Sequence, residues 1–224
     1  MLNLKNILFS KLQKFLPAII LILTLITFIG LTNAVLNQKT LWLDNSIIQF
    51  TIGLRAPFWT KIMIAISLYG DKIALALAAL LVIFTAYKKR FRQSGTLLFT
   101  IAIPLLFTYF FKNIIQRPRP NILYRLVTES GFSFPSQHAT VAFTIYPILA
   151  IWLWHNTTIN KILKVCLIFG LGLLAIIIGI SRLYLGVHYF SDILAGVVIG
   201  ISMAWLYYTL QSSNNIINAS YVKY

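Results

Sequence analysis

Long apolar runs separated by short polar segments are the dominant pattern of this chain. A helix that crosses a membrane needs about 20 consecutive, mostly apolar residues. The pattern predicts six such helices, over residues 16–36, 73–87, 95–111, 138–154, 164–180 and 189–210. The second of these runs is short, so we expect the residues before it to lengthen the helix. Six crossings would place both chain ends on the same side of the membrane.

The stretch over residues 40–70 fits a membrane crossing less well. It mixes apolar positions with charged residues such as Asp44, Arg55 and Lys61. Such a mixture is typical of a helix that lies along the membrane surface, so we expect an interfacial helical segment between the first two spans. The predicted fold class is all-α, a polytopic membrane helical bundle with about six transmembrane helices in a single domain over residues 1–224.

The amino-acid composition also indicates a membrane protein. Hydrophobic residues make up 59% of the chain and charged residues 10%, whereas a soluble domain has about 45–50% apolar and about 25% charged residues. The formal net charge is +15, from 19 Lys and Arg against 4 Asp and Glu. In a soluble protein this excess would suggest a nucleic acid partner. Here the basic residues lie between apolar runs, so we expect membrane lipids as partners, no nucleic acid, and infer no obligate protein partner.

The distribution of basic residues predicts the orientation, because cytoplasmic loops of membrane proteins are enriched in Lys and Arg. With six crossings, one side carries ten basic residues and no acid, and the other carries nine basic residues with all four acids. The dense basic segment over residues 88–92 lies on the first side and predicts cytoplasmic N- and C-termini. The connections over residues 112–137 and 181–188 would then face outward, which in the inner membrane of a bacterium means the periplasm.

Polar segments follow or precede apolar runs on that outer side, over residues 112–120, 131–140 and 181–192. Three of their cations are Lys112, Arg119 and Arg182, and guanidinium groups match phosphate oxygens well. Ser136 is a candidate N-cap of the fourth span. Backbone N–H groups and the helix dipole at a helix start both favour a bound anion. These segments therefore predict a phosphate-binding site.

The same segments contain His138, His188 and Asp192. A neutral imidazole nitrogen can attack phosphorus and form phosphohistidine. Asp192 follows His188 by four residues, so on a helix it can accept a hydrogen bond from the ring and fix its tautomer. His138 could protonate the leaving oxygen and later activate water.

We expect this chemistry to need no metal and no cofactor. Magnesium prefers carboxylate oxygens, and the chain has four acids in total. A zinc site built from the two histidines and Asp192 is the alternative, but it leaves the three cations unexplained.

The three polar segments resemble the motifs of the type 2 phosphatidic acid phosphatase family of membrane lipid phosphatases. Lys112 is followed after six residues by Arg119 and Pro120, as in the first motif of that family. Pro135, Ser136 and His138 fit the second motif, Pro-Ser-Gly-His, apart from Gln137 in place of the glycine. Ser181 and Arg182, then His188 and Asp192, reproduce the order and spacing of the third motif. The motif core thus covers about residues 112–192.

The resemblance implies that His188 is the nucleophile, Asp192 its partner and His138 the general acid. The phosphate-binding residues it implies are Lys112, Arg119, Ser136 and Arg182. We treat three further residues as auxiliary candidates, namely Arg117, Gln137 and Ser181. The spacing from the lysine favours Arg119 over Arg117, which leaves Arg117 as an auxiliary contact or a headgroup anchor.

The resulting expectation is a hydrolase that cleaves a phosphate or diphosphate lipid at the outer membrane surface. Undecaprenyl diphosphate, converted to undecaprenyl phosphate, is our first choice because related outward-facing bacterial enzymes act on it. Phosphatidylglycerophosphate, phosphatidic acid and lipid A phosphate remain alternatives. An alternative of another class is a non-hydrolytic protein that binds or transports anionic lipids. That protein would use the same cations but would not need the pair of His188 and Asp192.

Overall fold

The computed structural model describes the backbone of residues 4–221 and the side chains of residues 15–211. Its elements are the helices α1 (Leu4–Leu36), α2 (Leu41–Gly53), α3 (Pro57–Tyr87), α4 (Phe91–Ile115), α5 (Gln137–Asn156), α6 (Lys161–Tyr184) and α7 (Phe190–Tyr221), with a short 3₁₀ turn, η1 (Ile122–Tyr124). The described backbone contains no strand. The predicted all-α fold class is confirmed.

Five helices of the described part are long and apolar enough to cross a membrane: they cover Phe15–Leu36, Pro57–Tyr87, Phe91–Ile115, Lys161–Tyr184 and Phe190–Gln211. The remaining expected crossing is α5, whose 20 residues correspond to about 30 Å of helix. Four other helices pack around α5, namely α3, α4, α6 and α7. Because α5 is enclosed by protein, it can carry buried polar residues such as Thr140 and Thr144.

The segment expected between the first two spans is present, but it is shorter than predicted. Helix α2 ends at Gly53, and α3 begins at Pro57, where proline is favoured because its fixed φ suits the first helical turn. The second span therefore starts well before residue 73. Asp71 and Lys72 lie inside α3, and these charges obscured its length in the sequence.

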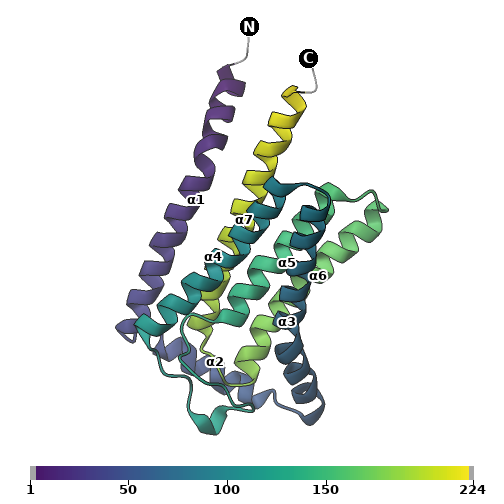
Figure 1. Ribbon diagram of the computed structural model, residues 1–224. Coiled ribbons are helices and arrows are strands. Elements are labelled where there is room, and N and C mark those ends of the chain that lie inside the picture. The colour runs from purple at the N-terminus through teal and green to yellow at the C-terminus, as the bar shows by residue number, and fades with distance from the viewer. Residues whose placement is uncertain (1–3, 222–224) are drawn as a thin grey trace.

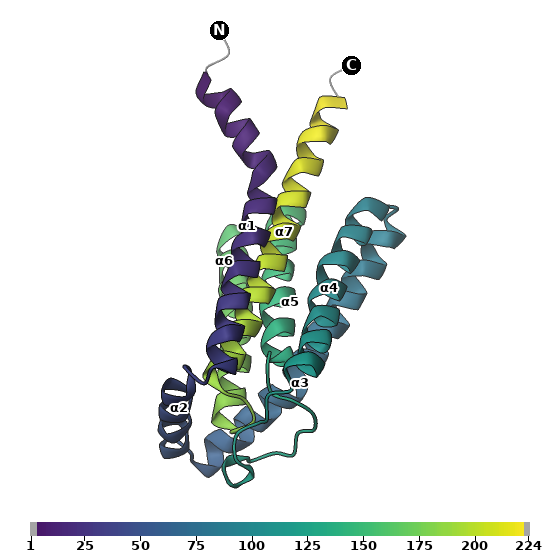
Figure 2. The same ribbon diagram turned by 90° about the vertical axis from the view of Figure 1, so that its left-hand side faces the viewer.

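The long helices run side by side, and both described chain ends lie at one end of the bundle (Figures 1 and 2). Helix α2 lies across the opposite end (Figure 1). The connections between α4 and α5 and between α6 and α7 are also at that end (Figure 1). The topology thus brings the three polar segments of the sequence together.

Two glycines let α7 approach the start of α5 closely. A Cβ atom at Gly196 would lie 2.6 Å from the Ser136 carbonyl oxygen, and one at Gly200 would lie 2.8 Å from the Phe143 Cβ. Small residues spaced four apart commonly serve such close packing in membrane helices. Gly196 lies one helical turn after Asp192, so this contact also sets where that aspartate sits relative to Ser136.

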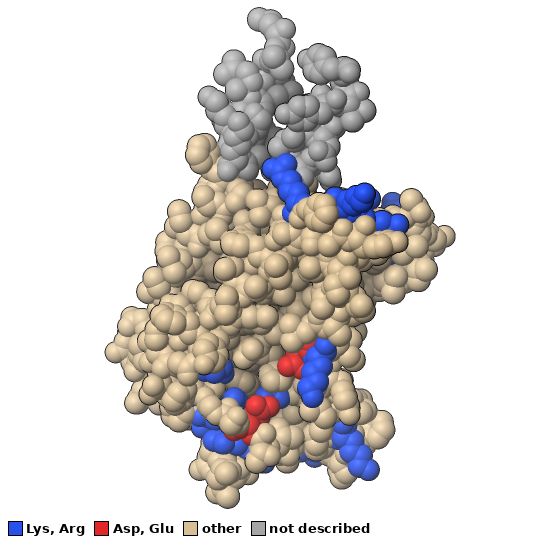
Figure 3. Space-filling view, viewed as in Figure 1, with Lys and Arg blue, Asp and Glu red and all other residues tan. Residues whose placement is uncertain are grey.

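Charged side chains are distributed in two zones on the face seen in Figure 3. On this face, basic side chains gather at both ends of the molecule, acidic ones lie only toward the end that holds α2, and the zone between them shows no charged side chain. An uncharged band between two charged zones is the surface expected of a protein that crosses a bilayer.

Candidate active site

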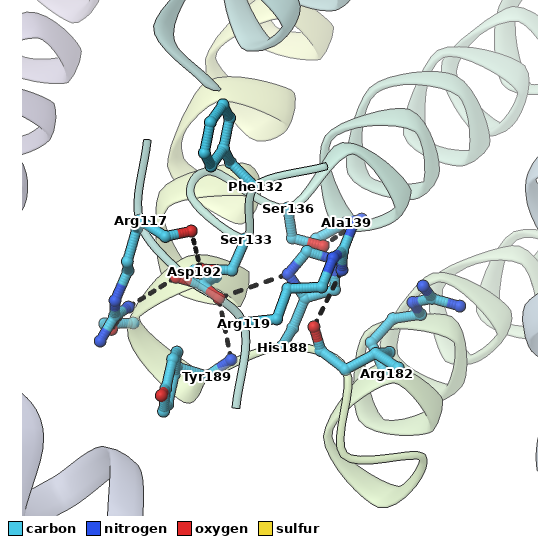
Figure 4. Close-up of polar contacts among 12 residues, drawn as sticks. Arg117, Arg119, Phe132, Ser133, Ser136, Ala139, Arg182, His188, Tyr189 and Asp192 are labelled. Carbon is cyan, nitrogen blue, oxygen red and sulfur yellow. Dashed lines mark hydrogen bonds and ion pairs between the residues drawn. The ribbon is translucent and has the colours of Figure 1, made fainter. Parts of the chain in front are cut away.

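The candidate site lies where α4 and α6 end and α5 and α7 begin, at the end of the bundle that holds α2 (Figure 1). Side chains from these segments converge there (Figure 4). Lys112 is in the last turn of α4, and Arg182 is in the last turn of α6. The site is therefore built mainly from helix ends, whose positions the bundle fixes.

His188 and Asp192 form the expected pair. The ring Nδ1 of His188 lies 3.3 Å from Asp192 Oδ2, and the backbone N–H of Tyr189 donates to the same oxygen at 2.9 Å. Both side chains are buried. The turn before His188 bends at Gly186, whose φ of +71° is a conformation that favours glycine.

A contact with Arg119 indicates the tautomer of His188. Arg119 Nη1 lies 3.2 Å from the ring Nε2, and a guanidinium group can only donate hydrogen bonds. Nε2 therefore acts as the acceptor, and the ring hydrogen belongs on Nδ1, where it faces Asp192. This is the form in which Nε2 keeps a free electron pair.

The environment of His188 favours the neutral ring. Burial lowers the pKa of His188 well below its usual value, and the positive charges of Arg182, Lys112 and Arg119 lower it further. A ring with a lowered pKa stays unprotonated as the pH falls below about 6.5, so Nε2 keeps its electron pair at neutral pH.

Backbone carbonyls of the connection between α4 and α5 hold two of the expected cations. Lys112 Nζ donates to the Phe132 carbonyl at 2.7 Å. Arg119 Nε and Nη2 donate to the carbonyls of Gly131 and Ser130 at 3.0 and 2.9 Å. These contacts, all with neutral backbone groups, hold both side chains beside the histidine.

Arg182 is partnered by an acid. Its Nη2 donates to Glu129 Oε1 at 2.5 Å, and its Nη1 donates to the Ser67 hydroxyl. Its Nε is buried and has no hydrogen-bond partner among the described side chains and backbone. Glu129 Oε2 also lies 3.8 Å from Arg119 Nη2. Burial alone would raise the pKa of Glu129, but Arg182 outweighs it and holds that pKa below its ordinary value.

Ser136 is the N-cap of α5, as expected, and its hydroxyl accepts from the backbone N–H of Ala139 at 3.5 Å. Gln137 is exposed and begins the helix. Non-glycine residues with positive φ in the described backbone are Gln38, Lys89 and Gln116. Gln137 is not among them, so its backbone does not need the glycine of the family motif.

His138 lies beside an acid that the sequence did not connect to it. Its Nε2 is 3.3 Å from Asp71 Oδ2 of α3. The side chains of the two remaining auxiliary candidates bind other groups of the protein. The Ser181 hydroxyl donates to the Ile178 carbonyl of its own helix, and Arg117 binds acids rather than pointing to a headgroup.

Arg117 joins two buried carboxylates. Its Nη1 lies 2.5 Å from Asp192 Oδ1, and its Nη2 lies 2.7 Å from Asp44 Oδ2. The guanidinium also stacks on the Tyr189 ring at 4.1 Å from the centroid. Sequence reasoning missed Asp44 and Asp71 as members of this site, and it did not predict that Glu129 pairs with Arg182. The available signal was their rarity, because an acid in so apolar a chain is costly to bury and so suggests a function.

Comparison with known proteins identifies the family of this chain. Residues 93–216 match the model of the PAP2 superfamily. The chain belongs to the PAP2 superfamily. It is 33% identical to phosphatidylglycerophosphatase B of Bacillus subtilis over 78% of this chain and 84% of that protein. It is 28% identical to an undecaprenyl-diphosphatase of Sulfolobus acidocaldarius over 69% of this chain and 72% of that protein.

A solved structure of a PAP2 phosphatase has the same fold. The crystal structure of the transmembrane PAP2 type phosphatidylglycerolphosphate phosphatase from Bacillus subtilis superimposes with a TM-score of 0.76 at 26% identity. The match covers 89% of this chain and 97% of that one. This PAP2 protein is thus a multi-pass integral membrane lipid phosphatase. The alternative expectation, a non-hydrolytic protein that binds or transports anionic lipids, is set aside.

Proposed function

We propose that this PAP2 protein cleaves its lipid phosphate through a phosphohistidine on His188, without a metal or cofactor. The observation that supports this most strongly is that both ring nitrogens of His188 have a polar partner. Nδ1 faces Asp192 at 3.3 Å, while Nε2 faces the guanidinium of Arg119 at 3.2 Å. An attacking nitrogen needs its partner nitrogen held in this way, and it needs cations beside the position of the phosphate.

In the first step, the electron pair of His188 Nε2 attacks phosphorus. A nitrogen–phosphorus bond forms while the bond from phosphorus to the lipid oxygen breaks. His138, whose protonated form the negative charge of the bound phosphate favours, donates its proton to that oxygen. In the second step, neutral His138 takes a proton from water, and the water oxygen attacks phosphorus. The nitrogen–phosphorus bond then breaks and its electrons return to Nε2, which releases inorganic phosphate.

The cations supply the electrostatic part of the reaction. Lys112, Arg119 and Arg182 stabilise negative charge on the equatorial oxygens, which is usually the largest catalytic contribution. Arg119 must turn from Nε2 to a phosphate oxygen when substrate binds. The buried Nε of Arg182 lacks a partner among the described groups, so it is a donor that a phosphate oxygen can use.

Phosphatidylglycerophosphate and undecaprenyl diphosphate are the two leading substrates. The Bacillus subtilis relative named phosphatidylglycerophosphatase B matches over most of both chains, and this favours the phosphatidylglycerophosphate headgroup. Undecaprenyl diphosphate is the substrate expected from the sequence resemblance, and the archaeal relative is named for it. Phosphatidic acid and lipid A phosphate follow as weaker candidates.

The proposed location is the bacterial inner membrane with the site facing the periplasm. The basic connection between α3 and α4 lies at the end of the bundle opposite the site (Figure 1), and positive loops favour the cytoplasm. The basic side chains of Lys5, Lys11, Lys14 and Lys223, which also support this orientation, lie outside the described side chains. We also propose that the chain forms a single domain over residues 1–224, with its motif core at about residues 112–192.

Phosphate release from a panel of the four lipids by the purified protein tests this function. We expect the highest kcat/KM for one of the two leading substrates, and unchanged rates after chelator treatment. The H188A variant should lose turnover by about 10⁴-fold or more while still binding lipid vesicles. Turnover by H188A close to wild type, or a rate that falls with chelator and recovers with a metal, would contradict the mechanism.

A further inference from the structure

The acid Asp44 is an unusual residue for the interfacial helix α2. Its side chain is fully buried, at 0% exposure, in a helix whose neighbouring residues are largely exposed. A buried carboxylate is costly unless it is paired and hydrogen-bonded. Asp44 also lies outside residues 93–216, which the family model matches. The role of Asp44 is therefore inferred from the groups that its carboxylate contacts.

Those partners all belong to the candidate active site. Asp44 Oδ2 accepts from Arg117 Nη2 at 2.7 Å and from the Ser191 hydroxyl at 2.7 Å. Asp44 Oδ1 accepts from the Ser191 backbone N–H at 2.9 Å. Ser191 is the residue just before Asp192, so α2 is fixed directly to the start of α7.

Arg117 connects Asp44 to Asp192. Its Nη1 donates to Asp192 Oδ1 at 2.5 Å, while its Nη2 is held by Asp44. The stacked Tyr189 ring covers the guanidinium plane. A planar guanidinium can serve two carboxylates at once, whereas the ammonium of lysine is a point charge and lacks this geometry.

Asp192 is thereby fixed through both of its oxygens. Oδ1 accepts from Arg117, so Oδ2 is left to Tyr189 N–H at 2.9 Å and to His188 Nδ1 at 3.3 Å. A rotated Asp192 would release the ring. We propose that Asp44 is a positioning residue, which holds Arg117 so that Arg117 orients Asp192 and Asp192 orients His188. This inference rests on the proposed role of His188 as nucleophile.

The test compares two inhibitors of the D44N variant, which keeps the side-chain shape but removes the charge. Orthovanadate can bond to an attacking nitrogen in a five-coordinate geometry, so its affinity reports how His188 is oriented. Inorganic phosphate is held by the cations alone. We expect D44N to lower kcat by 10- to 100-fold at a KM within about twofold, and to weaken vanadate inhibition at least tenfold. Inhibition by phosphate should change less than twofold.

The controls separate positioning from folding. The S46A variant changes an exposed hydroxyl of the same helix and should keep wild-type values. The R117K variant should reproduce the D44N pattern, and it serves as the test if D44N does not fold. The D44N/R117K double variant should be no slower than the slower single variant, because both residues act through the orientation of Asp192.

Two outcomes overturn the inference in different ways. If D44N and R117K keep the wild-type vanadate inhibition constant, Asp44 only anchors α2, because a smaller folded fraction lowers the rate without changing an inhibition constant. If wild-type protein releases phosphate but vanadate does not inhibit it, the proposed nucleophile fails, and the positioning role fails with it.

Discussion

Glu129 lies against two of the cations that we propose bind the phosphate of a substrate. Its carboxylate lies 2.5 Å from Arg182 Nη2 and 3.8 Å from Arg119 Nη2. Because its pKa is held below the ordinary value, Glu129 remains charged above about pH 4.3. At neutral pH an anion must therefore compete with Glu129 for these guanidinium groups.

The E129Q variant should bind inorganic phosphate more tightly. Removing the competing charge frees the two arginines, and we expect the inhibition constant of phosphate to fall about tenfold at pH 7, or roughly 1.4 kcal/mol. The effect should shrink as the pH falls through the lowered pKa of Glu129, where the wild-type carboxylate is also neutral. Competitive inhibition assays over this pH range measure it.

The E129D variant is the matched control, because it keeps the charge. Its phosphate inhibition constant should stay within about threefold of wild type. An E129Q variant that binds phosphate no more tightly than E129D would show that Glu129 does not compete for the site.

At the residue scale, the sequence predicted the groups that are related by spacing. His188 and Asp192 are four residues apart and meet in the structure as expected. The partners Asp44, Asp71 and Glu129 could not be assigned, because each meets its partner only through contacts between distant segments. Their roles depend on how the helices pack, which spacing along the chain does not encode.

Close packing between α5 and α7 is the element-scale feature that holds the site together. The backbone N–H of Ser136 donates to the Asp192 carbonyl at 3.0 Å. A Cβ atom at Gly196 would lie 2.6 Å from the Ser136 carbonyl oxygen and 2.8 Å from the Ala139 Cβ. One added methyl group there must push the two helices apart.

The G196A variant should therefore lose both stability and activity. Overpacking of this kind costs about 1–3 kcal/mol, and the movement would displace Asp192 from the helix start that carries Ser136. We expect a lower melting temperature in detergent and a kcat reduced at least tenfold. Thermal unfolding and phosphate release measure the two effects.

Gly172 provides the comparison, since an added Cβ atom there has nothing within 4 Å. The G172A variant should melt at the wild-type temperature or slightly above it, because alanine favours a helix more than glycine does. Equal melting temperatures and equal rates for the G196A and G172A variants would contradict the packing argument.

The elements themselves were largely readable from the sequence. Apolar runs located the long helices, because a membrane crossing fixes the required length. The start of α3 was missed, since Asp71 and Lys72 interrupt its apolar pattern. The charge has a structural partner, because Asp71 lies 3.3 Å from His138 of α5. The apolar pattern of the sequence does not show that α3 packs against α5.

For the whole molecule, the basic connection between α3 and α4 predicts the orientation, because positively charged loops favour the cytoplasm. Both described ends and the connection between α3 and α4 lie opposite the candidate site (Figures 1 and 2). A reporter enzyme that is active only in the periplasm should be inactive when fused after Lys89. The same reporter fused after Leu123, an exposed residue of η1, should be active. The reverse pattern would place the site in the cytoplasm.

The account as a whole depends on a covalent bond between phosphorus and His188. The most direct measurement is to mix the protein with a lipid labelled in its terminal phosphate, stop the reaction within milliseconds and locate the label by peptide mapping. We predict a label on His188 that is lost in acid and retained in base, as expected of a phosphorus–nitrogen bond, and that is absent from H188A. A wild-type protein that turns over the lipid without ever carrying label on His188 would contradict the account.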